Sequence, residues 1–409
     1  MKTIKLFIIT SLFFFMLADI NAQVTNYGTN SGTGGEASSY FGTGTGRLSL
    51  GLSNTFIGHT SGYDNTTGNY NTFTGANAGL FNTEGSFNVF NGYKAGYNNT
   101  TGSKNIFIGS QAGDNNTTGS DNHFIGAGTG FKNTEGEKNI FIGSNTGYDN
   151  TTGVENVFVG YAAGRFSTAS KNTFIGHATG YFNTTGADNV YNGYAAGYNN
   201  TTGSDNTFMG FASGYKNTIG NKNILIGQAA GYENITGENN VLVGAEAGTN
   251  IEGSGNICLG YRAGYDEIGH NKLYIDNNYY NEDNDSLTNA PLIYGDFSTG
   301  QLGINTDSIP EDYMLAVKGR VIATEMRVKN SENWSDYVFL SEYDLLSIED
   351  LETFISNEQH LPDVPSAEEV AAQGGSDVGE MNKILLQKVE ELTLYIIQLN
   401  KKIAGMEKQ

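Results

Sequence analysis

The sequence predicts a mainly β protein whose larger part is a parallel β-solenoid, followed by a small β connector and an α-helical coiled coil. A glycine recurs thirteen times between Gly58 and Gly260 at steps of 17 or, twice, 16 residues. In every unit an asparagine stands four residues before this glycine and a second glycine four residues after it. All four prolines follow the array, and continuous strand ladders exclude proline. A short fixed period of this kind is typical of coils that stack on one another.

Within the first clean unit, residues 54–69, strand alternation separates two sets of side chains. Asn54, Phe56 and Gly58 share one face of a short strand, and Thr55 and Ile57 share the other. The Phe56 position is apolar in all thirteen units, so we expect it to form the core. The Ile57 position also admits Thr and Asn, and we expect a second, partly covered surface there where neighbouring chains could meet. In two units, the residues assigned to the structural repeat are Asn54, Phe56, Gly58, Gly62, Asn105, Phe107, Gly109 and Gly113.

The rest of each unit predicts a tight bend and a turn. The residue before the second glycine is always small, which indicates close backbone approach inside the coil or between chains. Residues 65–68, Asn-Thr-Thr-Gly, are typical of a turn, because Asn and Gly tolerate left-handed dihedral angles. The invariant Asn54 position predicts a ladder in which each side-chain amide bonds the amide of the next coil.

The flanking segments divide the chain further. Before the array, Tyr40 belongs to a degenerate first unit within a loose N-terminal cap. After it come short alternating segments and two helices with capping boxes that begin at Ser347 and Ser366. The expected organisation is 23–53 cap, 54–277 solenoid head, 278–330 β connector, 331–377 small helical region and 378–409 coiled coil.

The N-terminus predicts export. Lys2 and Lys5 precede the apolar run Leu6–Ala18, and Ile20-Asn21-Ala22 follows as the cleavage site before Gln23. These are the three regions of a secretory signal peptide, so we expect residues 1–22 to be removed and the mature chain to lack a transmembrane segment. The expected location is secreted or on the cell surface.

Composition excludes some partners and sites. The formal charge of −21 disfavours nucleic acid as a partner. One cysteine, Cys258, cannot form a disulfide or zinc framework within the chain. His59 and His177 share a repeat position but lie seven units apart, roughly 33 Å along a stacked rod. The turns after Asp64 lack the G-G-x-G-x-D pattern of calcium-binding β-rolls. We expect no metal, no cofactor and no enzymatic activity.

The F-I-G-x-x-(A/S/T)-G pattern over Asn54–Gly264 resembles the head repeats of trimeric autotransporter adhesins. The resemblance implies a left-handed parallel β-roll and three associated chains. That family ends in a membrane-embedded barrel, whereas this sequence ends after a predicted helix, so we expect no autotransporter anchor. The segment Leu292–Phe297 and the C-terminal tail resemble the ends of exported fibre-like proteins common in the Bacteroidetes.

The tail carries an apolar heptad repeat over about four heptads, which is typical of a coiled coil. β-Branched residues at a with leucine at d favour two strands, whereas the head resemblance implies three, and we favour a trimer over a dimer. The residues assigned to the oligomer interface are Leu385, Val389, Leu392, Ile396, Leu399 and Ile403.

Together these features predict an exported, adhesin-like surface fibre that presents a repetitive face to a glycan or another host or cell-surface ligand. The alternative is a phage-type tail fibre with a C-terminal intramolecular assembly chaperone. Ser335-Asp336 matches the start of such a chaperone's cleavage motif, but the Arg-Leu-Lys part is absent, so we do not expect cleavage. The signal peptide counts against this alternative.

Overall fold

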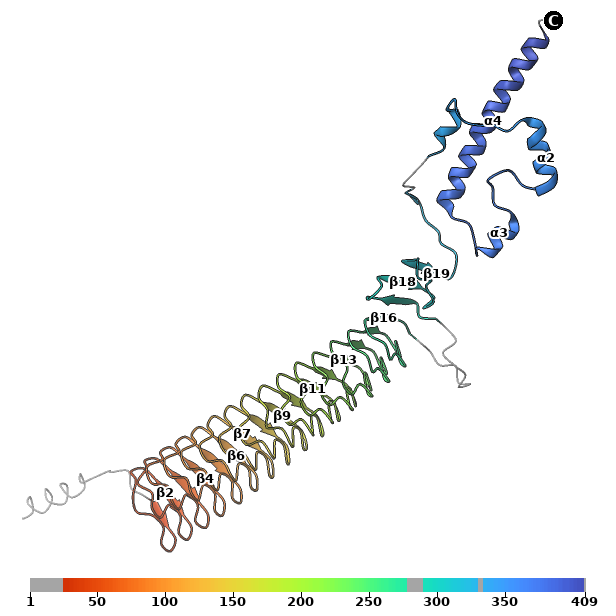
Figure 1. Cartoon of the computed structure of the whole chain (residues 1–409). Helices are drawn as coiled ribbons and strands as arrows, with labels where there is room; N and C mark the ends of the chain where they lie inside the picture. Colours follow the sequence, from red (N-terminus) through yellow and green to blue (C-terminus); the bar gives the residue numbers. More distant parts are fainter. Residues whose placement is uncertain (1–24, 278–289, 330–333, 408–409) are drawn as a thin grey trace, which may run out of the picture. The chain divides into compact units, whose positions relative to one another are not determined.

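The computed structural model describes residues 25–277, 290–329 and 334–407 (Figure 1). The predicted signal peptide and most of the expected loop at 278–290 lie outside these residues. The chain divides into two compact units, Met1–Arg320 and Val321–Gln409, and each is described by itself.

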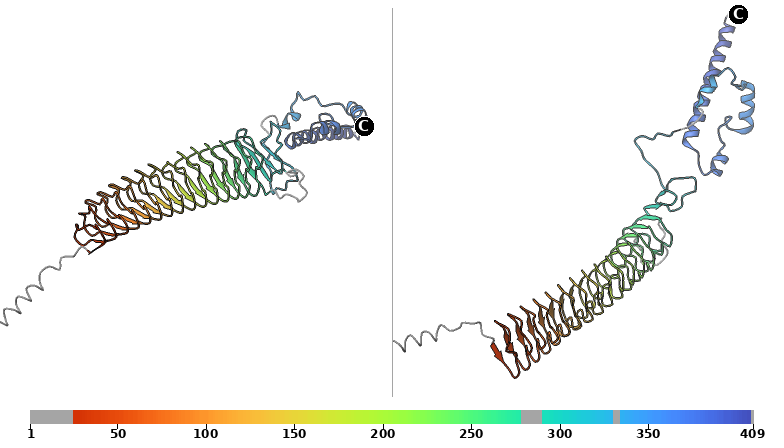
Figure 2. Two further views of the ribbon diagram at one scale, coloured as in Figure 1. Left: turned by 90° about the horizontal axis from the view of Figure 1, so that it is seen from below. Right: turned by 60° about the vertical axis from the view of Figure 1, so that its left-hand side comes forward.

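The first unit is a parallel β-solenoid, which confirms the predicted fold class. Each coil contributes one short strand, and successive strands pair in parallel so that the coils stack like a ladder (Figures 1 and 2). The ladder has sixteen strands rather than about thirteen. They are β1 (Thr25–Tyr27), β2 (Ser39–Phe41), β3 (Thr55–Ile57), β4 (Thr72–Thr74), β5 (Val89–Asn91), β6 (Ile106–Ile108), β7 (His123–Ile125), β8 (Ile140–Ile142), β9 (Val157–Val159), β10 (Thr173–Ile175), β11 (Val190–Asn192), β12 (Thr207–Met209), β13 (Ile224–Ile226), β14 (Val241–Val243), β15 (Ile257–Leu259) and β16 (Lys272–Ile275).

The extra coils come from both ends of the array. β1 and β2 lie in the segment expected to be a loose cap, and Tyr40 on β2 pairs with Phe56 and is fully buried. At the other end, β16 pairs in parallel with β15, as expected for a closing strand. The ladder therefore begins before residue 54.

The central residue of each repeat strand forms the core, as predicted. Phe56 pairs with Phe73, and their rings stack with centroids 4.7 Å apart and planes 9° apart. In-register stacking continues from coil to coil, so each ring is covered on both faces by its neighbours. The fully buried members of this column are Tyr40, Phe56, Phe73, Phe90, Phe107, Phe124, Phe141, Phe158, Phe174, Tyr191, Phe208, Leu225, Leu242 and Cys258.

The invariant strand asparagines are buried, but the expected amide–amide ladder is not their main interaction. The side-chain oxygen of Asn54 accepts the backbone N–H of Asn71 at 2.9 Å, and its Nδ2 donates to the Gly68 carbonyl at 2.9 Å. The amide–amide ladder belongs to the turn asparagines instead. Nδ2 of Asn82 donates to Oδ1 of Asn65 at 2.7 Å, and Asn99 repeats this bond to Asn82 at 2.6 Å.

Backbone conformation and close packing explain why both repeat positions hold glycine. Gly58 has φ +131°, and a Cβ there would lie 2.5 Å from the Gly75 carbonyl oxygen of the next coil. Gly62 has φ +58°, and its Cβ would lie 2.5 Å from the Phe56 ring. The small residue before this glycine, such as Ala78, is fully buried, which places the close approach inside the coil.

The connector extends the same sheet with a change of direction. β17 (Ile293–Asp296) pairs antiparallel with β16, β18 (Gln301–Ile304) pairs antiparallel with β17, and β19 (Leu315–Val317) pairs parallel with β18. The short strands expected here are present, but among the described residues none follows Val317.

The second unit is helical. It contains the 3₁₀ helix η1 (Ser335–Phe339), α2 (Ile348–Glu358), α3 (Ala367–Ala372) and the long helix α4 (Val378–Met406). The Ser347 side chain caps α2, and Ser366 and Glu369 form a reciprocal capping box on α3. The helices expected at these positions are confirmed, whereas η1 was not foreseen. Pairing of α4 in a coiled coil stays a prediction.

Candidate functional site

The residues assigned to the structural repeat lie inside the coils. Asn105 and Phe107 are fully buried, and Gly109 and Gly113 hold the backbone conformations that their neighbours in the coil require. These positions build the rod, and the outward-facing rows of side chains do not take part in its core.

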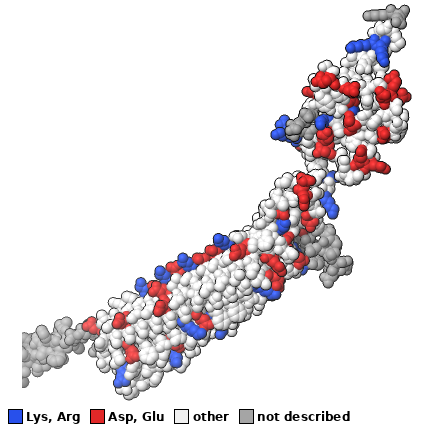
Figure 3. Space-filling model, in the orientation of Figure 1, with Lys and Arg blue, Asp and Glu red and all other residues white. Residues whose placement is uncertain are grey.

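The outward face of the strands carries two rows of side chains without a single formal charge. The positions of Thr55 and Ile57, followed through β3–β15, hold mainly Ile, Val and Thr, and Ile57 is 42 % exposed. In a chain with 65 charged residues (22 basic and 43 acidic), an uncharged strip of this length is a candidate contact surface. Figure 3 shows charged side chains along the margins of the rod and a broad uncharged band between them.

Half-buried aromatic residues form further columns. The rings of Tyr181, Tyr198, Tyr215 and Tyr232 stack in sequence with centroids 5.0–5.1 Å apart. Because each ring face inside the column meets another ring, the column offers mainly ring edges to solvent. These tyrosines therefore stabilise the stack of coils more than they provide a platform for a ligand.

A groove runs along the turn side of the solenoid. It has a volume of about 710 Å³ and crosses five coils. One wall is a column of turn threonines, and the other comes from the residue that follows the aromatic position of each unit. The groove is lined by Phe81, Thr83, Asn98, Thr100, Asn115, Thr117, Lys132, Thr134 and Thr151.

The threonine wall is held by regular hydrogen bonds. The Thr100 hydroxyl donates to the Thr117 carbonyl at 3.0 Å, and the Thr117 hydroxyl donates to the Thr134 carbonyl at 3.0 Å. The Thr100 backbone N–H also donates to the Thr117 carbonyl, at 2.9 Å. The turn backbone is therefore paired from coil to coil.

The opposite wall is open because two consecutive coils carry short amides. Asn98 Nδ2 donates to Asn115 Oδ1 at 3.2 Å, and Asn115 Nδ2 donates to the Phe131 carbonyl at 2.9 Å. Phe81 stands at one end, with its ring edge-to-face with Tyr97. At the other end Lys132 pairs with Asp149 at 2.5 Å, and this partner raises the pKa of Lys132.

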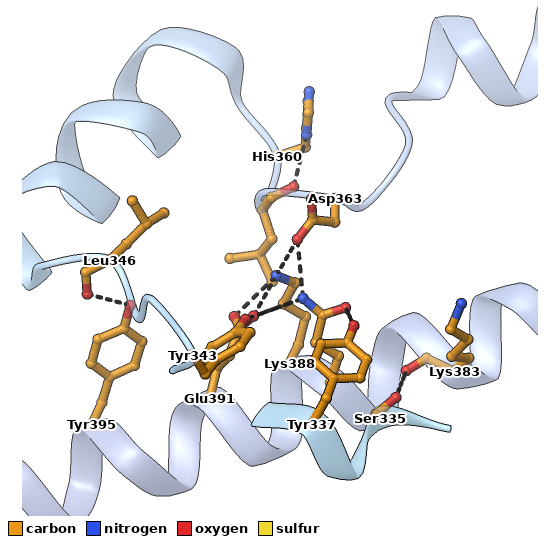
Figure 4. A network of polar contacts seen from close by, with 12 residues as sticks. Ser335, Tyr337, Tyr343, Leu346, His360, Asp363, Lys383, Lys388, Glu391 and Tyr395 are labelled. Carbon is orange, nitrogen blue, oxygen red and sulfur yellow. Dashed lines mark hydrogen bonds and ion pairs between the residues drawn. The ribbon is translucent and has the colours of Figure 1, made fainter. Parts of the chain in front are cut away.

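In the second unit, the side of α4 that the chain itself covers carries a network of polar contacts (Figure 4). Gln387 is buried, accepts a hydrogen bond from the Tyr337 hydroxyl at 2.7 Å and donates to Asp363 at 3.1 Å. Lys388 bridges Asp363 and Glu391 at 3.1 and 3.0 Å. This network fixes the 335–363 segment on the helix.

The predicted oligomer-interface residues lie on the other side of α4 and are exposed. Leu392 and Ile396 are each 57 % exposed. The remaining residues of the predicted interface are also exposed, namely Leu385, Val389, Leu399 and Ile403. The helix thus holds a polar network against its own chain, while this apolar stripe stays exposed. Three of its residues, Leu385, Val389 and Leu392, border a groove whose other wall includes Leu351, Leu361 and Pro362.

Ser335 has no lysine ammonium as its hydrogen-bond partner. Its hydroxyl donates to the backbone carbonyl of Lys383 at 2.8 Å, while the Lys383 ammonium lies 3.2 Å from Glu380 (Figure 4 shows the former bond). The arrangement positions η1 against α4.

Across the described ranges, no three His, Cys, Asp or Glu side chains lie close enough to hold a metal ion. His177 stacks between Tyr161 and Tyr194, with centroids 5.2 and 5.0 Å away. No helix in the described part of the chain is both long and apolar enough to cross a membrane. Comparisons with protein-family models, curated proteins and solved structures found no match.

Proposed function

We propose that this protein is the subunit of an exported, homo-oligomeric surface fibre. In this proposal the solenoid is a stiff, acidic rod that presents a repetitive face for adhesion, and the C-terminal helix joins the chains. The stripe on α4 carries the proposal, because an apolar heptad pattern that stays exposed in one chain is typical of a helix that pairs with copies of itself.

The two sides of α4 support self-association over folding onto the same chain. The segment 335–363 occupies the polar side through Gln387, Lys388 and Glu391. The stripe residues stay exposed in one chain, and burying such side chains contributes about 25 cal/mol per Å². A second copy of the helix would supply that burial.

The solenoid also supports self-association of the chains. The uncharged outward rows of β3–β15 form a long regular strip of β-branched side chains, and monomeric proteins rarely expose contiguous apolar patches of such size. Contacts between the rods of neighbouring subunits would cover it. We favour three chains, on the head resemblance, over the two that the pattern of β-branched a and leucine d residues favours.

Surface location is tested on cells that produce the protein. Antibody raised against the solenoid should label intact cells, and brief protease treatment of those cells should remove the label. A variant that lacks residues 1–22 is the matched control and should label only after lysis. Labelling of the full chain only after lysis would contradict the proposal.

A further inference from the structure

We propose that the groove beside the turn threonines binds a linear, uncharged polysaccharide segment that runs along the rod. This inference deepens the proposed adhesive function by naming a site and a ligand class. It concerns the stretch from Phe81 to Thr151, well inside the solenoid.

The groove exists where the wall residues are short. The same position of the unit holds Phe81, then Asn98 and Asn115, then Lys132. Further along it holds Phe166 and Phe182, whose rings stack 5.5 Å apart. Phe81 and Lys132 therefore border a gap two coils long, and the groove lies along it. The position varies along the whole rod and holds asparagine again at Asn199 and Asn250.

The groups that line the gap suit sugar rings. Each carboxamide has two N–H donors and an oxygen with two lone pairs, and the bonds described above use only part of this capacity at Asn98 and Asn115. Phe81 is 38 % exposed and gives an aromatic surface for the apolar face of a pyranose. The threonine methyl groups add apolar contact along the opposite wall.

The spacing also fits a chain of sugars. Adjacent parallel strands lie about 4.8 Å apart, so equivalent groups on the threonine wall recur at about that interval. This interval is close to the advance of one hexose in an extended β-linked chain. A glycan aligned with the rod would thus meet the same groups at successive residues, and five threonines span about four to five sugar units.

Other occupants fit less well. An extended peptide would need unpaired strand-edge groups, whereas the turn backbone here is paired between coils. A polyanion would be repelled by a chain of charge −21. The lysine at the groove end is already paired with Asp149 and so offers little attraction for an anion. The open, elongated shape favours a polymer over an enclosed small molecule.

The test titrates the processed full chain with four neutral hexasaccharides, namely cellohexaose, chitohexaose, xylohexaose and mannohexaose, by calorimetry and saturation-transfer NMR. We expect at least one to bind with a dissociation constant between tens of micromolar and millimolar. Asn115→Phe should weaken that binding at least tenfold by filling the gap. Phe is native at this position in other coils, so the fold should tolerate it, which thermal unfolding would verify.

Asn199→Phe is the matched control, since it places the same side chain at the same position of a distant coil, and should bind like the wild type. Phe81→Ala should weaken binding severalfold. Failure of all four sugars to bind, equal binding by Asn115→Phe, or tighter binding of an alginate hexasaccharide would overturn the inference. Oligomer mass and surface labelling are measured on the same proteins. A wild-type chain that binds none of the sugars but still assembles and labels on the surface would contradict the groove and leave the proposed fibre standing.

Discussion

Asn71 donates its backbone N–H to the side-chain oxygen of Asn54, 2.9 Å away and one coil earlier in the chain. The same Asn54 side chain donates to the Gly68 carbonyl of its own turn. One buried carboxamide thus joins strand, turn and next coil. Repetition of this arrangement explains why asparagine occupies the position in all thirteen units.

Removing one such side chain should destabilise the rod. Asn105 donates to the Gly119 carbonyl at 2.8 Å and accepts the Asn122 N–H at 3.0 Å. Asn105→Ala leaves the Asn122 N–H buried without a partner, whereas the Gly119 carbonyl keeps its hydrogen bond from Asn116 at 2.9 Å. Denaturation followed by circular dichroism should show a loss of about 1–3 kcal/mol, the cost of one unsatisfied buried group. Asn199→Ala, at a half-buried position outside the core, should change stability by less than about 0.5 kcal/mol, and equal effects would contradict the assignment.

Replacing the second repeat glycine of a coil should destabilise the protein strongly. Replacing another glycine of the same bend, which also has a positive φ, should not. Gly130 has φ +56°, and an added Cβ would lie 2.4 Å from the Phe124 ring. Gly128, in the same bend, has φ +64°, and an added Cβ would lie 2.9 Å from the Asn145 side chain and at an ordinary contact distance of 3.5 Å from the Tyr148 ring. Alanine is native at the Gly128 position in other coils, for example Ala162 at φ +53°.

We therefore expect Gly130→Ala to destabilise the protein by more than about 3 kcal/mol, through overpacking and backbone strain. Gly128→Ala should cost less than about 1 kcal/mol, because the flexible Asn145 side chain can move away. Thermal unfolding of the two variants side by side measures the difference. Similar losses would show that φ alone, without the ring contact, determines the requirement.

Charges of alternating sign at one position of successive coils should contribute modestly to the stability of the solenoid. Lys138 and Glu155 lie 3.7 Å apart on successive coils, and both are exposed. In the sequence the same position alternates in sign over six coils: Lys104, Asp121, Lys138, Glu155, Lys171 and Asp188. Glu155→Lys places lysine in three consecutive coils and should cost about 0.5–1 kcal/mol at low salt.

This loss should nearly vanish at 1 M salt, where the screening length falls to about 3 Å. Glu155→Gln is the intermediate case and should lose less than the reversal. A loss that does not depend on salt would indicate a packing defect instead of repulsion between charges.

Cys258 should report the opening of the solenoid. Its thiol is fully buried, and burial raises its pKa to about 12, so almost no thiolate is present at pH 8. A disulfide reagent should therefore leave the native protein unmodified for hours and react with the unfolded chain within minutes. Because the chain has one cysteine, the rate follows opening of the last coils alone. Rapid reaction under native conditions would contradict the burial.

The repeat made most of the rod predictable. Fixed asparagine, phenylalanine and glycine positions define one coil. When identical coils stack in register, equivalent residues pair, so Phe56 pairs with Phe73. The bonding role of each asparagine was harder to predict. Both Asn54 and Asn65 recur, and both donate to the Gly68 carbonyl, at 2.9 and 3.0 Å. They differ in the group that their side-chain oxygen accepts: the backbone N–H of Asn71 for Asn54, and the side-chain amide of Asn82 for Asn65.

The irregular parts were less predictable for the same reason. β1 and β2 belong to the ladder although the repeat is degraded there, because backbone pairing needs little from the side chains. The groove depends on two short residues between larger ones, Asn98 and Asn115. Their variation was visible in the sequence, but the depth that it creates depends on the neighbouring threonine wall.

Assembly through α4 is the central claim, and sedimentation equilibrium of residues 23–409 tests it most directly. We expect a mass that is an integral multiple of the chain mass, with three chains favoured. Leu392→Asp with Ile396→Asp should give a monomer with an unchanged solenoid signal, and Gln398→Asp, on the exposed side away from the stripe, should leave the oligomer intact. A wild-type chain that sediments as a monomer at tens of micromolar would contradict the account.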